Sequence, residues 1–214
     1  MGKIIFSLII GLFFLYPQSV AGQHVSKIDL IVNGGIGIPA DPAPWSDNWK
    51  WGLTGGAGIS YRFSPHISIG AHIDYHSFLF DDYNFSGRLP FTEHIRDIEA
   101  QHSSIIGVSA EAKYMVLPFS ENLSPYVTAG VGFQRFFMSD IYIAEYTWDG
   151  FFIYDETLEG STSYGAFIIA GGGLNIASSE SRSYFIEVRY GIGFSEDEPN
   201  HFLPIRIGFR HRLY

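Results

Sequence analysis

The sequence predicts an all-β chain that folds as an eight-stranded antiparallel transmembrane β-barrel. Three observations predict it: apolar and polar residues alternate along most of the chain, short and long connections alternate between these segments, and the polar positions carry glycine and charges of both signs. Alternation with period two is typical of strands whose two faces meet different surroundings. At 214 residues, the chain is long enough for one closed sheet.

The first 22 residues predict a signal peptide. Lys3 provides a positive charge, Ile4–Leu15 is an apolar run, and Ser19-Val20-Ala21 offers small residues for cleavage. The run is shorter than the about 20 residues that a transmembrane helix needs. We therefore expect an exported chain in which residues 23–214 form a single barrel domain.

Eight segments show the alternation, and several approach the roughly 9 to 11 residues of a tilted membrane strand. Strands are expected over Lys27–Ile38, Trp51–Phe63, Ile67–Tyr75, Ile106–Val116, Val127–Phe133, Ala166–Ile176, Ile186–Phe194 and Ile205–Leu213.

The connections are short at 64–66, 117–124 and 178–183, and longer at 39–50, 80–103, 138–161 and 195–202. Outer-membrane barrels combine tight periplasmic turns with long external loops, so this order favours a membrane barrel. A soluble calycin-like barrel is the alternative, and it would have to turn the charged faces outward into water.

The polar faces predict a filled interior, because eight strands enclose a space just wide enough for side chains. Glycine makes room there for arginine, and carboxylates can pair with the arginines, since unpaired buried charges are costly. The expected interior polar network consists of Arg62, His72, Asp74, His76, Glu111, Lys113, Glu187, Arg189, Arg206 and Arg210.

Part of this network has the residue types of a metal site. His72, Asp74 and His76 share one face, but alternate strand positions lie about 7 Å apart, which is wide for one ion. We therefore expect a buried polar network here, with no metal and no cofactor. The net charge of −9 argues against nucleic-acid binding, and the absence of cysteine excludes disulfides.

The stretches GGAGISYRF, SPYVTAGVGF and FIEVRYGIGF resemble recurrent strands of the small eight-stranded outer-membrane barrels of Gram-negative bacteria, the OmpX- and OmpA-type group. The resemblance is one of pattern and covers about 190 residues of the chain. It implies contact with outer-membrane lipid and lipopolysaccharide, insertion by the outer-membrane assembly machinery, and both termini in the periplasm. It implies no particular activity.

The long connection 138–161 contains two apolar arms around Asp149-Gly150, which is a strong hairpin signal. A further membrane hairpin is one interpretation, but the arms are short for a crossing. We prefer an aromatic ribbon that continues strands five and six beyond the membrane. Its open edges could bind an extracellular protein partner by strand addition. The expected contact residues are Tyr142, Tyr146, Trp148, Phe151 and Tyr154; packing of the ribbon over the barrel mouth is the alternative.

The sequence favours a non-enzymatic protein that acts through its external loops, in surface interaction or envelope integrity. A narrow, porin-like channel for small apolar molecules is one alternative. A lipid A-modifying hydrolase is another. His102 and Ser104 have a spacing that would put both on one face of a strand, and the pair resembles the histidine and serine of outer-membrane lipid A deacylases, with Glu99 or Glu111 as the orienting carboxylate. We expect no catalytic residues.

Overall fold

A computed structural model describes residues 27–89, 95–118, 122–195 and 198–213. The expected signal peptide lies outside these residues. In the described part of the chain, no helix is long and apolar enough to span a membrane.

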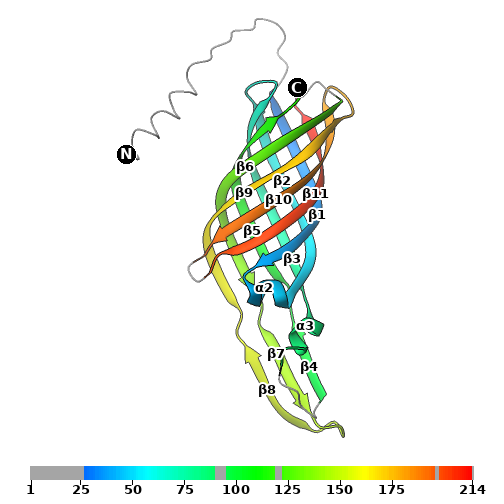
Figure 1. Ribbon diagram of the computed structural model, residues 1–214, viewed down its shortest axis with the longest axis vertical. Helices are drawn as coiled ribbons and strands as arrows, with labels where there is room; N and C mark the ends of the chain where they lie inside the picture. The colour runs from blue at the N-terminus through cyan, green and yellow to red at the C-terminus, as the bar shows by residue number, and fades with distance from the viewer. Residues whose placement is uncertain (1–26, 90–94, 119–121, 196–197, 214) are drawn as a thin grey trace, which may run out of the picture.

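Eight strands close into an antiparallel barrel, as the sequence predicts (Figure 1). Their order around the barrel is β1-β11-β10-β9-β6-β5-β3-β2. The strands are β1 (Ile28–Asp41), β2 (Trp49–Arg62), β3 (Ile67–Phe80), β5 (Ser103–Met115), β6 (Leu123–Met138), β9 (Ser161–Ala177), β10 (Arg182–Phe194) and β11 (Asn200–Arg212).

The barrel closes where the first strand pairs with the last. β1 pairs with β2 on one side and with β11 on the other, from Asp29 opposite Arg212 to Asp41 opposite His201. Ile28 and Arg212 therefore lie at the same end of the barrel, which we call the terminal end. The tight turn 64–66 is also here, and the hydroxyl of Ser64 accepts hydrogen bonds from the backbone of His66 and Ile67, at 3.2 and 3.0 Å.

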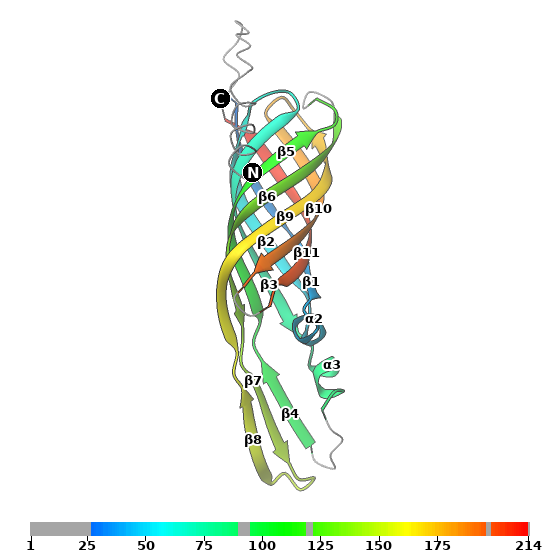
Figure 2. The ribbon, with the colours of Figure 1, turned by 60° about the vertical axis from the view of Figure 1, so that its left-hand side comes forward.

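A second sheet, which we call the blade, extends three of the barrel strands. It consists of β4 (Ile95–Ala100), β7 (Ile141–Tyr146) and β8 (Phe152–Leu158) in the order β4-β7-β8. Figure 2 shows the blade projecting from the end of the barrel opposite the terminal end.

The blade keeps the register of the barrel. Met138 pairs with Ser161 in β6 and β9, and Ile141 pairs with Leu158 three residues further along each chain segment. Where the ladder is interrupted, the Asp140 side chain accepts a hydrogen bond from the Gly160 amide at 2.7 Å. β4 likewise continues the pairing of β5 with β6.

The expected ribbon around Asp149-Gly150 is confirmed as a hairpin that prolongs β6 and β9. Thr147 and Phe151 close the turn, and Gly150 adopts a φ of 82°, a conformation that glycine adopts without strain. The prediction of two open ribbon edges is wrong for one of them, because β4 pairs along β7. β4 escaped prediction since its sequence, IRDIEA, alternates poorly and carries three charges.

The strands are longer at the blade end than the alternation predicts. There the inward-facing positions become apolar, as at Phe78 and Phe136, so both strand faces are apolar and the pattern is lost. Two short helices that the sequence did not predict, α2 (Ala43–Asn48) and α3 (Asp82–Ser86), complete this end. An apolar cluster joins the inner wall of the barrel to the helices and the blade: Trp45, Trp49, Phe78, Phe85, Ile105, Phe136, Ile141, Ile143 and Phe202.

The barrel wall is apolar outside and polar inside. Val32, Leu53, Phe133 and Ile207 expose 59, 69, 76 and 66% of their surface on the outer face. The inward neighbours of such residues are buried and polar, as the alternating burial of β5 and β10 shows. This is the opposite of a calycin-like barrel, so the soluble alternative is excluded.

Glycines on neighbouring strands give the interior charges their space. Gly56, Gly130 and Gly171 lie directly opposite Asp74, Glu111 and Arg189, respectively. A Cβ atom at Gly56 would lie 2.0 Å from the Asp74 carboxylate and 2.7 Å from the Ile73 carbonyl. The glycines are therefore required by the side chains across the ladder.

We predict that Gly56→Ala destabilises the barrel by about 1 to 3 kcal/mol, because the added methyl group overpacks the wall beside Asp74. Gly55→Ala is the matched control, since a Cβ there meets its nearest atom, the Asn33 carbonyl oxygen, at 3.6 Å. Urea unfolding of both variants in phospholipid vesicles measures the difference. Equal stabilities would contradict the close-packing argument.

Candidate functional site

Two regions carry the functional groups of the chain: the charged lumen of the barrel and the exposed blade. At the centre of the lumen, the carboxylate of Glu187 accepts hydrogen bonds from Arg189 and, at 2.7 Å, from Arg206. Lys113 lies 3.7 Å from its second oxygen. Glu187 is 1% exposed, so these cations provide its charge compensation in place of water.

Two further carboxylates extend this network across the lumen. Glu111 accepts a hydrogen bond from Arg189 at 2.5 Å, and Asp74 accepts one from Arg206 at 2.8 Å. Three carboxylates thus meet three cations, Lys113 included. The layer is balanced in charge, which is the condition for burying it.

His72 borders the same layer. Its Nε2 atom lies 3.7 Å from Glu111, and His72, Asp74 and Glu111 offer ligand atoms within 4.8 Å of one another. Donors that share one zinc ion at about 2.0 to 2.2 Å lie closer together than this. Both carboxylates are also engaged by arginine, so we assign this cluster to the charge network and propose no metal site.

All ten residues of the expected interior network lie on the inner face, but they do not form a single cluster. His76 bonds the hydroxyl of Thr54 at 2.8 Å, nearer the blade end, and stacks against Phe78. Arg62 makes a two-pronged hydrogen bond with Asp29 near the terminal end, at 2.7 and 2.8 Å.

Sequence reasoning missed Asp29, which is fully buried. Its position could have been found, because it alternates with the outward series Ile28, Leu30 and Val32. Arg212 lies 3.9 Å from the same carboxylate. Arg210, close by, donates to Asn175 at 3.4 Å.

Apolar side chains border the charged layer toward both ends. Toward the terminal end lies the cluster of Ile31, Met115, Tyr126 and Phe185, with the Lys113 ammonium 4.0 Å from the centre of the Tyr126 ring. Toward the blade end lies the larger cluster around Trp45 and Phe78. The lumen is therefore packed with side chains along its length.

The expected contact residues of the ribbon lie on the blade and are mostly exposed. Trp148 and Phe151 expose 77 and 72% of their surface at the tip. Tyr154 and Tyr142 are exposed on the strands, and the Tyr142 hydroxyl donates to Asp155 at 3.3 Å. Tyr146 is half-buried against Phe152.

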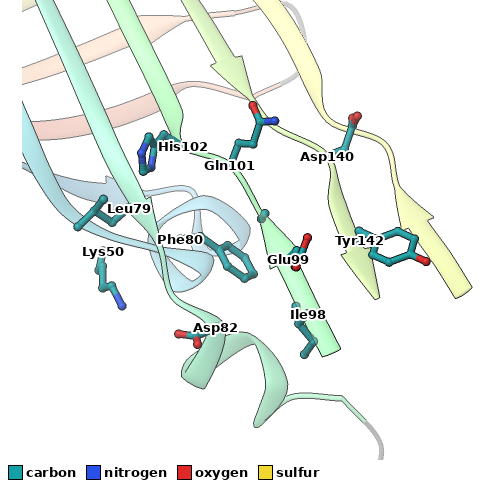
Figure 3. Close-up of a pocket in the computed structure, with 11 residues that line it drawn as sticks. Lys50, Leu79, Phe80, Asp82, Ile98, Glu99, Gln101, His102, Asp140 and Tyr142 are labelled. Atoms are coloured by element: carbon teal, nitrogen blue, oxygen red, sulfur yellow. The ribbon is translucent and has the colours of Figure 1, made fainter. Parts of the chain in front are cut away.

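A groove of about 710 Å³ lies where the blade leaves the barrel (Figure 3). Lys50 and Phe80 lie on one side of it, Tyr142 and Asp140 on the other, and His102 near the barrel. The groove mixes apolar, acidic and basic groups.

The arrangement expected for hydrolysis is not formed by the described residues. β5 begins at Ser103, so His102 precedes the strand and is exposed, and the prediction that it shares a strand face with Ser104 is wrong. No hydrogen bond between His102 and Ser104 occurs in the described part of the chain. Glu111 lies on the inner face of the barrel wall, away from both.

A closed sheet with an apolar outer wall and a charge-balanced interior defines the class of transmembrane β-barrels, whose strands satisfy their backbone hydrogen bonds around a ring. The chain has the fold of the small eight-stranded outer-membrane barrels. It is similar to the crystal structure of Neisserial surface protein A, with a TM-score of 0.54, 13% identity, and coverage of 89% of this chain and 100% of that chain.

Two further solved structures match with lower scores. The first is the N-terminal β-barrel domain of Pseudomonas aeruginosa OprF, with a TM-score of 0.47, 13% identity, and coverage of 87% of this chain and 99% of that chain. The second is Ail, the attachment invasion locus protein of Yersinia pestis, with a TM-score of 0.41 and the same identity and coverage. No protein-family model and no curated protein sequence matches the chain.

We predict that Glu187→Gln lowers the free energy of unfolding by about 3 kcal/mol, because it leaves buried cations without their shared counter-charge. Glu159→Gln makes the same chemical change at an exposed position and should change stability by less than about 0.5 kcal/mol. Urea unfolding in vesicles measures both. A small effect at Glu187 would show that water, and not this carboxylate, compensates the cations.

Proposed function

We propose that this chain is a non-enzymatic outer-membrane protein that presents the blade at the cell surface and binds a partner there by strand addition. In this arrangement the signal peptide directs export, the assembly machinery inserts the barrel, and lipid and lipopolysaccharide surround the apolar wall. Both termini lie in the periplasm, so the blade points outward.

One observation carries this proposal: β8 is an edge strand of the blade, and every one of its seven residues is exposed. An unpaired edge presents a row of backbone donors and acceptors that an extended segment can bind. The barrel cannot use this edge itself, because each of its strands already has a neighbour on both sides.

The contacts in the lumen favour binding at the surface over transport. A channel needs a continuous water-filled path, whereas here apolar clusters border a charge network held together by direct hydrogen bonds. His102 precedes β5, Ser104 lies within it, and no hydrogen bond between them occurs among the described residues. This likewise favours a non-enzymatic role over a hydrolase.

Surface display can be tested with single cysteines, since the chain contains none of its own. We predict that a membrane-impermeant maleimide labels Thr157→Cys on intact cells, because this residue lies on β8. The control Ser179→Cys, in the turn at the terminal end, should be labelled only after the outer membrane is disrupted. The reverse labelling pattern would overturn the proposed orientation and the proposed function with it.

We also predict that the purified chain forms no steady ion-conducting pore in planar bilayers, because side chains fill its lumen. Measurement of single-channel current in potassium chloride tests this, with an open porin as the positive control. Regular conductance steps, absent from a bilayer given detergent alone, would favour the channel.

A further inference from the structure

We propose that the open edge of β8 selects a cationic extended segment as the strand it binds. This inference rests on the proposed function and names the chemistry of the partner. It depends on the shape of the edge, on the charge of the blade and on the side chains at the middle of β8.

The open edge is long and held in place by the barrel. Pairing of β9 with β10 ends at Ala166, and Gly165 still lies against the Phe194 carbonyl. No described residue pairs with 161–164 on this side, so they continue the open edge of β8 toward the barrel. Because β8 keeps the register of β9, the edge does not have to be ordered when a partner binds. A strand that pairs here therefore loses only its own conformational freedom.

The blade is strongly acidic. Residues 95–102 and 139–160 contain eight carboxylates and a single basic residue other than histidine, Arg96. Arg96 already pairs with Glu145 at 2.5 Å. The remaining carboxylates are Asp97, Glu99, Asp140, Asp149, Asp155, Glu156 and Glu159.

Two of these carboxylates stand at the middle of the open edge. Asp155 and Glu156 are adjacent in β8, so their side chains project from opposite faces of the blade. A bound strand would place one of its own side chains about 5 Å from each of them. Lysine or arginine at two consecutive positions would meet both carboxylates. The aliphatic stem of the one that faces Glu156 would cover the exposed Tyr154 and Leu158 on the same face.

The same charges disfavour a second copy of the chain as the occupant. An antiparallel pair of β8 strands centred on Asp155 would place the two Asp155 side chains opposite each other, which is destabilising. Charged edge strands are a common protection against self-association. Charge repulsion therefore disfavours pairing of β8 with a second β8, and charge attraction favours a segment of opposite charge.

The test uses the full-length chain in bilayer nanodiscs of neutral phosphatidylcholine, with fluorescent peptides about nine residues long, slightly longer than β8. The cationic peptide has consecutive central lysines among valine and threonine. Three analogues carry glutamine in place of lysine, glutamate in place of lysine, or backbone N-methyl groups that remove the donors needed for pairing. Fluorescence anisotropy measures the Kd of each.

We expect the lysine peptide to bind at least about tenfold more tightly than the glutamine peptide. The glutamate and N-methylated peptides should not bind. The variant Asp155→Lys/Glu156→Lys should reverse the preference in favour of the glutamate peptide, a result that a misfolded protein cannot give. Asp97→Lys/Glu99→Lys makes the same charge change on β4 and should keep the preference for lysine.

The other outcomes separate the two proposals. If the lysine and glutamine peptides bind equally and N-methylation abolishes binding, strand addition at β8 is supported and the selection for positive charge is wrong. Two results would show general electrostatic attraction and overturn the inference. In the first, the lysine peptide still binds after N-methylation. In the second, the β4 variant weakens lysine-peptide binding as much as the β8 variant does. If no peptide binds, both the inference and strand addition at β8 are wrong.

Discussion

The structure depends on enclosing charged side chains inside the barrel, where they pair with one another. The outer wall is apolar, so the ionic groups of β3, β5, β10 and β11 face a lumen that eight strands make just wide enough for side chains. There they must neutralise one another at contact distance, as Glu187 does with Arg189 and Arg206. The glycines opposite the charged residues and the filled interior both follow from this requirement. The charge network thus takes the place of an apolar core, because most apolar side chains of the barrel lie on its outer face.

Much of this arrangement could be predicted from the sequence. Alternation locates all eight barrel strands, because a wall between an apolar and a polar medium imposes period two on every strand that crosses it. The inner face of each strand then follows, and with it the ten interior residues. The actual partners do not follow. Asp74 and Arg206 are 132 residues apart, and they meet only because ring closure brings β11 next to β1 and across from β3.

The blade end was less predictable for a physical reason. Where strands leave the wall, both faces can pack against protein, and the two-sided signal disappears, as at Phe78 and Ile105. β4 is stabilised by its pairing with β7, which its own composition does not reveal. The helices α2 and α3 are too short to show a helical period, and they are held by tertiary contacts of Trp45 and Phe85. Asp149-Gly150 was the exception, since a tight turn is encoded locally.

The unbroken register between blade and barrel has a mechanical consequence. A partner held on β8 while the cell surface moves would pull along strands that run directly into the barrel wall. Such a load acts parallel to the strands, in shear, so many ladder hydrogen bonds share it at once. The weakest points are then the interruptions at Ser139-Asp140 and Glu159-Gly160, where one hydrogen bond from the Gly160 amide to the Asp140 carboxylate replaces the ladder. The blade is therefore a stiff continuation of the barrel wall, and its attachment at these two interruptions is weaker than the wall itself.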